Sequence, residues 1–148
     1  MKLSTKGRYG VRLMIDIASH YGGSPVLLRE ISKRQEISEK YLWHLINPLK
    51  AAGLITATRG MKGGYTLAKS PAEITMKEIL QASEGSFCLV DCVETPSTCK
   101  RVPICVARDM WSEIADSIGS ILTSTTLADM VKRQKAKKEN LASDNYSI

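Results

Sequence analysis

The chain has 148 residues and a net charge of +6, with 43% hydrophobic and 24% charged residues, which is ordinary for one globular domain with a short extension. No apolar run is long enough to span a bilayer, and the basic start lacks the apolar core and cleavage site of a secretory signal, so a cytoplasmic protein is expected. Residues 1–70 carry twelve Lys and Arg against four Asp and Glu, while residues 71–131 carry four against nine. This asymmetry is typical of a chain whose first half contacts nucleic acid, although a solvated basic surface would also produce it.

Three helices are predicted in the basic half. The spacing of apolar residues predicts a first helix that ends at Gly22, a short second helix over residues 27–35, and a third helix that Ser38 caps and Gly53 closes. Pro48 should kink or end the third helix at the residue before it, because proline lacks the N–H that the helix ladder needs. The residues expected to face the core are Val11, Met14, Ile17, Ala18, Tyr21, Leu28, Ile31, Tyr41 or Leu42, Leu45, Ile46 and Leu49.

Two β-rich runs flank the sequence "RGMKGG", residues 59–64, and predict a hairpin with a glycine-rich, cationic tip. A short helix, a turn, a second helix and such a hairpin follow the order of a winged helix-turn-helix. We therefore predict a mainly α fold with a β-hairpin wing, in which residues 1–82 form a DNA-binding domain. The candidate DNA contacts are Ser38, Glu39, Lys40, Tyr41, Trp43 and His44 of the third helix, Arg59, Gly60 and Lys62 of the wing, and Lys6 and Arg8 near the start. The helix residues would meet base edges and the cations would bind phosphates, although Trp43 could equally have a packing role.

All four cysteines lie in the sequence "CLVDCVETPSTCKRVPIC", residues 88–105, within a predicted loop over residues 83–103. They are Cys88, Cys92, Cys99 and Cys105. Clustered thiols in a reducing compartment more often bind a metal or react with oxidants than form disulfides. The spacing C-x3-C-x6-C-x5-C fits the paired knuckles of a zinc site only in its first gap, so zinc, an iron–sulfur cluster and a thiol redox switch all stay open. The chain has no C-x-x-C motif and no histidine near these thiols, which argues against a thiol enzyme.

Two further helices are predicted on either side of the cysteine loop. Thr75 and Glu78 form the capping box of the first. After Pro103, apolar residues recur at alternating intervals of three and four, the spacing at which two helices pack side by side. These seam residues are Ile104, Ala107, Trp111, Ile114, Ile118 and Ile121. Residues 104–131 are therefore predicted as a dimerisation helix region, unless the seam only covers the chain's own core, and residues 132–148 as a flexible charged tail.

Four stretches of the chain resemble the Rrf2 family of bacterial transcription factors, and within it the iron–sulfur cluster regulators: "KLSTKGRYGVRLMIDIA", "ISEKYLWHLINPLKAAGLI", "RGMKGGYTLAK" and "CKRVPICVARDMWSEI". The resemblance extends from residue 1 to about residue 132. It implies a winged-helix homodimer that binds double-stranded DNA at a palindromic operator and carries one iron–sulfur cluster, [2Fe–2S] or [4Fe–4S], per protomer. Such a protein is a regulator and not an enzyme. The alternative is a thiol-based, redox-responsive regulator that contains zinc or no cofactor.

The resemblance also implies which residues bind the cluster. The three cysteines of the family match Cys92, Cys99 and Cys105, with one extra residue between the first two. Arg108 stands where the iron–sulfur regulators have a histidine ligand, and a guanidinium has no free lone pair for a metal. Arg8 stands where the nitric-oxide-sensing branch has an acidic ligand. Cys88 is therefore the expected fourth ligand.

Overall fold

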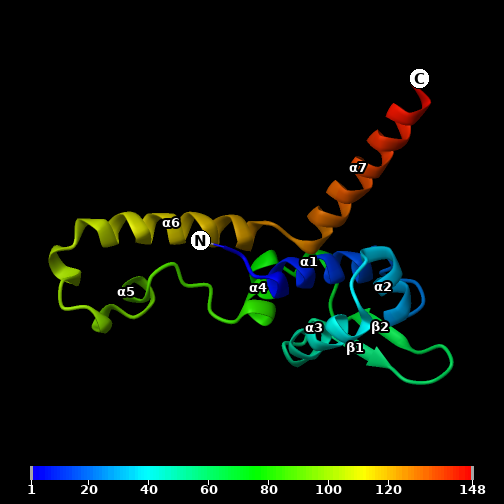
Figure 1. Cartoon of the computed structure of the whole chain (residues 1–148), viewed down its shortest axis with the longest axis horizontal. Coiled ribbons are helices and arrows are strands. Elements are labelled where there is room, and N and C mark those ends of the chain that lie inside the picture. The colour runs from blue at the N-terminus through cyan, green and yellow to red at the C-terminus, as the bar shows by residue number, and fades with distance from the viewer. Residues whose placement is uncertain (1, 148) are drawn as a thin grey trace.

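The structure, a computed structural model, describes residues 2–147 as a mainly α fold with one small β-hairpin (Figure 1). Its helices are α1 (Thr5–Ala18), α2 (Leu28–Gln35), α3 (Glu39–Ala51), α4 (Met76–Glu84), α5 (Asp91–Glu94), α6 (Val106–Ser124) and α7 (Leu127–Tyr146), and its strands are β1 (Ile55–Thr58) and β2 (Gly64–Leu67). Short 3-10 turns are η1 (Pro71–Glu73), η2 (Pro96–Thr98) and η3 (Val102–Ile104). In Figure 1, helices α1 to α4 and the hairpin form a body, from which the segment before α6 extends to one side and α7 to another. The predicted fold class is confirmed.

The wing is a two-stranded antiparallel sheet in which Ile55 pairs with Leu67. Val26 forms an isolated β-bridge with this sheet: its N–H donates to the carbonyl of Tyr65 at 2.9 Å, and the Tyr65 N–H donates to the Val26 carbonyl at 2.8 Å. Gly64 permits this pairing: it has a φ of +145°, and a Cβ there would lie 2.6 Å from the Val26 carbonyl oxygen. The wing is thereby fixed to the loop between α1 and α2.

The core of the body contains most of the residues that the helical spacing selected. Met14, Ile17, Ala18, Ile31, Leu42, Leu45, Ile46 and Leu49 are all buried, while Val11, Leu28 and Tyr41 are half-buried and pack against the core. One of these expectations is wrong. Tyr21 is exposed, because α1 ends at Ala18 and Tyr21 lies in the following turn. Helix α3 also does not end before Pro48, which is one of the two outcomes expected there, the other being a kink: the fully buried Leu49 lies in its last turn, and the Ala52 N–H donates to the Pro48 carbonyl.

Helices α1 and α4 pack closely because α1 has glycines where they meet. A Cβ on Gly10 would lie 2.4 Å from the hydroxyl oxygen of Ser83, and a Cβ on Gly7 would lie 2.3 Å from a carboxylate oxygen of Glu84. No other residue type fits at these positions without movement of the α4 side chains. The C-terminal end of α4 is therefore held directly against the first turns of α1.

The helices after the cysteines differ from the expected single helix and tail. Helix α6 ends at Ser124, and Thr126 caps the start of α7 through a capping box with Asp129. Leu127 is fully buried, and its N–H donates to the Ile74 carbonyl at 2.8 Å, so the start of α7 is anchored to the body. Residues expected to form a charged tail therefore continue a helix as far as Tyr146. None of the helices within residues 2–147 combines the length and the apolar character needed to cross a membrane.

Candidate nucleic-acid interface and cysteine segment

Helix α3 presents one face to solvent, beginning at its cap. The Ser38 hydroxyl accepts a hydrogen bond from the Tyr41 N–H at 3.2 Å, as predicted. Glu39, Lys40 and His44 are exposed, and Trp43 is 52% exposed with its ring edge-to-face against His44, at a centroid distance of 5.9 Å. Trp43 therefore has no place in the core. A large apolar side chain is thus available on the solvent face of the helix.

Tyr41 has a different environment from the other candidate DNA contacts on α3. It is half-buried, and its ring packs edge-to-face against Tyr9 of α1, with centroids 5.7 Å apart and planes at 84°. Such aromatic pairs stabilise the contact between two elements. In this conformation Tyr41 orients α3 on α1, and its neighbours form the exposed surface.

The basic residues of α1 lie near that surface. Lys6, Tyr41 and His44 line the same hollow of about 470 Å³ between α1, α3 and α4, so the structure brings the N-terminal turn of α1 beside the exposed face of α3. Arg8 is exposed, and its guanidinium donates to the Thr5 hydroxyl at 3.4 Å. Both cations are free of carboxylate partners in the described part of the chain.

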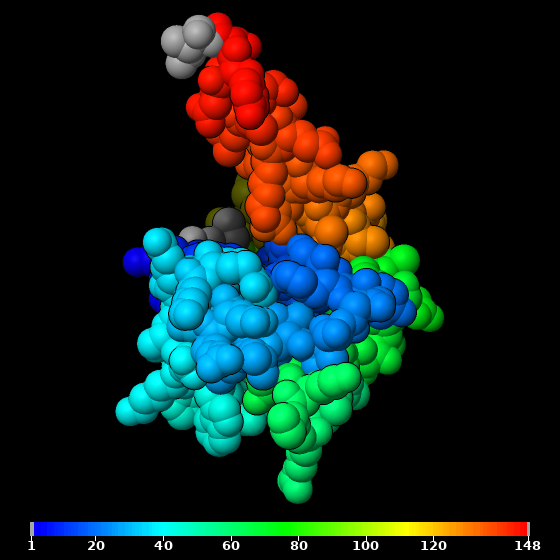
Figure 2. All heavy atoms as spheres, turned by 90° about the vertical axis from the view of Figure 1, so that its right-hand side faces the viewer, coloured from blue at the N-terminus to red at the C-terminus, as the bar shows by residue number. Residues whose placement is uncertain are grey.

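The tip of the wing is an exposed turn with two cations. Arg59, Gly60 and Lys62 are exposed, and the Gly63 N–H donates to the Gly60 carbonyl at 3.0 Å to close the turn. Figure 2 shows the hairpin tip projecting from the lower side of the body, and α3 lies on the same lower side in Figure 1. The predicted contacts of α3 and the wing therefore lie toward one side of the molecule.

Glu84, the last residue of α4, makes contacts with α1 that the sequence did not predict. Its Oε1 accepts hydrogen bonds from the Ser4 N–H at 3.0 Å, the Gly7 N–H at 2.9 Å and the Ser4 hydroxyl. A carboxylate there complements the positive end of the α1 dipole. Gly85 follows with φ +86° and ψ −139°, a conformation that favours glycine, and begins the segment that carries the cysteines. An acidic residue directly before a helix-terminating glycine was the available signal, but its partners lie about eighty residues away.

The four cysteines are all free and half-buried, in a segment of short turns between α4 and α6. Within residues 2–147, no three His, Cys, Asp or Glu side chains lie close enough together to hold a metal ion. Four thiols are the right number and type of ligand for a metal or an iron–sulfur cluster, but in this conformation they do not lie close enough together to bind one. The guanidinium of Arg108 connects this segment to α6, because its Nε donates a hydrogen bond to the carbonyl oxygen of Cys92 at 2.9 Å.

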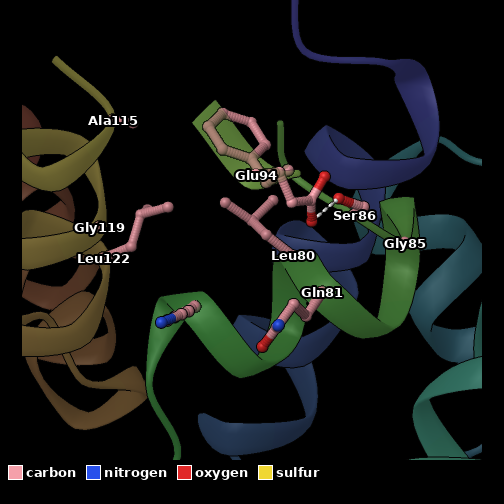
Figure 3. A pocket seen from close by; sticks show the side chains of 10 residues that line it. Leu80, Gln81, Gly85, Ser86, Glu94, Ala115, Gly119 and Leu122 are labelled. Atoms are coloured by element: carbon pink, nitrogen blue, oxygen red, sulfur yellow. Dashed lines mark hydrogen bonds between the residues drawn. The ribbon is translucent and has the colours of Figure 1, made fainter. Parts of the chain in front are cut away.

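Cys88 lies beside a carboxylate. Loss of solvation and the hydrogen-bonded, negatively charged Glu94 both raise the pKa of the Cys88 thiol. The pKa of Glu94 is lowered by a hydrogen bond from the Ser86 hydroxyl, which donates at 2.6 Å (Figure 3), and by a hydrogen bond from Cys88. The environment of Cys88 in this conformation therefore disfavours the thiolate form that would bind a metal.

Helix α6 carries the predicted seam on an uncovered surface. None of its nineteen residues is buried. Of the seam residues, Ile114 and Ile118 are half-buried, while Ala107, Trp111, Ile121 and, in η3, Ile104 are exposed. A cavity of about 530 Å³ separates α6 from α4, with Ala115, Gly119 and Leu122 on one side and Leu80 on the other (Figure 3). The seam therefore does not serve to cover the core of its own chain.

The exposed face of α3, the cationic hairpin after it and the basic first half of the chain define a winged helix-turn-helix regulator. Comparison with known proteins gives the family. The model of the Rrf2 family, described as an iron-dependent transcriptional regulator, matches residues 3–133. The chain belongs to the Rrf2 family. It is a DNA-binding transcriptional regulator and not an enzyme.

Individual relatives cover nearly the whole chain. Protein rrf2 of Nitratidesulfovibrio vulgaris is 41% identical over 132 residues, which are 89% of this chain and 88% of that protein. The structure of CymR, described as the global cysteine regulator of B. subtilis, is similar with a TM-score of 0.78 and 37% identity, over 90% of this chain and 98% of that one. The structure of T. potens IscR is similar with a TM-score of 0.74 and 40% identity, over 90% and 88%. The relatives thus include both a cysteine regulator and an IscR.

Proposed function

We propose that this chain is a homodimeric regulator whose affinity for a palindromic operator is set by an iron–sulfur cluster on the cysteine segment. The observation that carries this proposal is that four free, half-buried thiols share one segment, which connects the DNA-binding body to α6. The family description as iron-dependent and the similarity to IscR support it. The state of the cluster on the cysteine loop would be the signal, and the winged-helix body would bind DNA.

Cys92, Cys99 and Cys105 are the proposed ligands, with Cys88 as the fourth. A bound cluster would supply one-electron redox chemistry and sensitivity to iron supply or nitric oxide. Because the thiols do not gather in this conformation, the segment must rearrange to bind the group. Its turns α5, η2 and η3 contain no buried residue, so little packing opposes that movement. The hydrogen bond from Arg108 would keep the Cys92 backbone next to α6.

Glu84 supports a route by which the segment could affect DNA binding. It lies one residue before Gly85, where the segment leaves α4, and it holds the N-terminal turn of α1 that includes Lys6. Movement of the segment about Gly85 would alter these hydrogen bonds and so shift the basic turn beside α3. The Glu84→Ala variant should then show a smaller difference in operator affinity between cluster-loaded and cluster-free protein, at unchanged iron content. An unchanged difference would reject this route.

DNA and a second copy of the chain are the proposed partners. Lys40, Trp43 and His44 would enter the major groove, while Arg59 and Lys62 of the wing would bind the adjacent backbone. The uncovered seam on α6 would pack against the same helix of the partner, since a twofold interface uses one surface twice. Dimerisation would place two DNA-binding domains at a fixed spacing, which a palindromic operator requires.

Anaerobic purification tests the cofactor. The protein should be brown and contain iron and sulfide, and Cys→Ala changes at residues 92, 99 and 105 should each remove the visible absorption. Cys88→Ala should do so too if Cys88 is the fourth ligand, while Ser97→Ala in the same segment serves as the matched control. Colourless protein that contains zinc, or no metal, would contradict the proposal.

Operator affinity tests the regulation. A duplex selected by the wild-type protein from a random library should bind cluster-loaded and cluster-free protein with different Kd values. Equal Kd values, measured at one salt concentration, would show that the cluster does not control operator affinity. The proposal that the protein binds DNA would then stand without the proposed regulation.

A thiol-based regulator with zinc or no cofactor is the second candidate. It is favoured by the absence, within the described residues, of any three gathered donor side chains. In that case an oxidant should change the Kd of metal-free protein, and a reductant should restore it. Cys88 should react with the oxidant more slowly than an unperturbed thiol, because loss of solvation and Glu94 raise its pKa.

A further inference from the structure

The tip of the wing carries an apolar side chain for which the contacts proposed above give no role. Met61 stands between the cations Arg59 and Lys62, and its relative exposure is 105%. A single exposed apolar residue is common on protein surfaces, so exposure alone carries little weight. The position of Met61 in the turn gives it significance.

The turn directs Met61 away from the protein. The hydrogen bond from the Gly63 N–H to the Gly60 carbonyl places Met61 and Lys62 at the two corners of the turn. Gly60 has a φ of +106°, and a Cβ on Gly63 would lie 2.4 Å from the Thr58 carbonyl oxygen. Glycine is therefore required on both sides, and the backbone holds the corner residues outward.

The rest of the chain does not cover this side chain. Met61 and Lys62 border an open hollow of about 650 Å³, with Tyr21 and Ser24 of the loop after α1 among its other lining residues. In Figure 2 the hairpin tip projects from the lower side of the body, the side on which α3 also lies in Figure 1. A surface that receives α3 would therefore meet the wing tip as well.

We propose that Met61 inserts into the minor groove of the operator and unstacks one base step, while Arg59 and Lys62 bind the phosphates on either side. The proposal rests on the proposed DNA contacts of α3 and the wing. A narrow minor groove attracts Arg and Lys through its negative potential. Methionine is one of the apolar side chains that wedge between base steps and bend the duplex toward the major groove.

The wedge would add sequence preference without a hydrogen bond to any base. Pyrimidine–purine steps, TA and CA/TG, unstack with the least cost. The operator should therefore have such a step where the wing meets each half-site. Replacement of that step by a stiff A-tract should weaken binding by wild-type protein and have little effect on a Met61→Ala variant.

The test compares Met61→Ala, Lys62→Ala and wild type on one duplex, which the wild-type protein selects from a random library. Met61→Ala should bind about tenfold more weakly at every salt concentration, with an unchanged salt slope, because it removes an apolar contact. Lys62→Ala should reduce the slope by about one, because it removes a phosphate contact. Energy transfer between dyes at the duplex ends should show a smaller bend with Met61→Ala. Leu141→Ala is the matched control, since Leu141 is 64% exposed on α7 and should change none of these values.

The outcomes separate this inference from the proposed function. Met61→Ala that binds within twofold of wild type, or bends the duplex equally, overturns the wedge and leaves DNA binding intact. Wild-type protein that selects no duplex overturns both. The thermal unfolding midpoint of Met61→Ala should equal that of wild type, because Met61 loses no contact within the protein.

Discussion

Substitution of Gly10 by alanine tests the close packing of α1 on α4, on which the Glu84 contacts depend. The new Cβ would lie 2.4 Å from the Ser83 hydroxyl oxygen and 3.1 Å from the Ser83 Cβ. Alanine is favoured over glycine inside a helix by about 1 kcal/mol. Overpacking of a buried contact costs about 1–3 kcal/mol. The overpacking outweighs the gain in helix propensity, so we expect Gly10→Ala to lower the free energy of unfolding by up to about 2 kcal/mol.

Ser83→Ala should partly rescue this loss. Ser83 is buried, and its hydroxyl has no hydrogen-bond partner among the described residues. An unsatisfied buried hydroxyl is itself unfavourable by about 1–3 kcal/mol, so its removal alone should be neutral or stabilising. In the double variant the 2.4 Å contact disappears and the 3.1 Å contact stays. The two changes should therefore couple by about 1 kcal/mol in the favourable direction.

Urea unfolding of the four proteins at one pH measures the coupling. The midpoints should change while the m-values stay equal, because the exposed surface of the unfolded state does not change. Strictly additive variants would refute the close contact. Ser83→Ala that destabilises by more than about 1 kcal/mol would show that the hydroxyl has a hydrogen-bond partner.

Three further predictions concern other contacts. Burial tends to raise the pKa of Asp16, but hydrogen bonds from Arg34 and Gln35 and the Arg34 charge outweigh it and lower the pKa. The carboxylate therefore contributes its full stabilisation above about pH 4, the ordinary pKa of the unfolded state, and this stabilisation is lost as the pH falls toward the lowered pKa. In unfolding titrations, Asp16→Asn should lack this part of the loss of stability in acid. Thr75→Ala removes one half of the capping box of α4 and should lower the free energy of unfolding by about 1 kcal/mol in urea titrations. Ile118→Glu places a charge in the α6 seam and should shift the protein from dimer to monomer in sedimentation at micromolar concentration, whereas an equal change at the exposed Ser120 should not.

The winged-helix body could be predicted because its signals are local. Ser38 and Gly53 mark the two ends of α3, and both act as expected: the Ser38 hydroxyl caps the helix, and Gly53 has a φ of +73°. The β-bridge that fixes the wing to the loop after α1 could not be predicted, since it pairs Val26 with Tyr65, far apart in the chain. The break before α7 had a local signal, the capping box of Thr126 and Asp129, which the apolar spacing obscured.

The site shows the same division. The types of donor in the cysteine segment follow from the sequence, but the spacing of Cys88, Cys92, Cys99 and Cys105 allows several groups, and a loop without a regular period does not determine where its side chains meet. The Glu84 contacts with Ser4 and Gly7 span 77 to 80 positions, so only the folded chain reveals them. Long-range polar contacts of this kind leave no periodic pattern in a sequence.

The placement of the core fits the proposed function, in which a stable DNA-binding body is joined to a cysteine segment that rearranges. Of the residues that the structure describes, those of the buried core lie at positions 13–79 and at Leu127, and none lies in the cysteine segment. Rearrangement or loss of what the thiols bind would therefore remove no core contact from the DNA-binding body. Elements with few buried contacts open at low free energy, while the core keeps the global stability. The proposed signal would then pass through Gly85 and Glu84 as a change in affinity, with the body folded in both states.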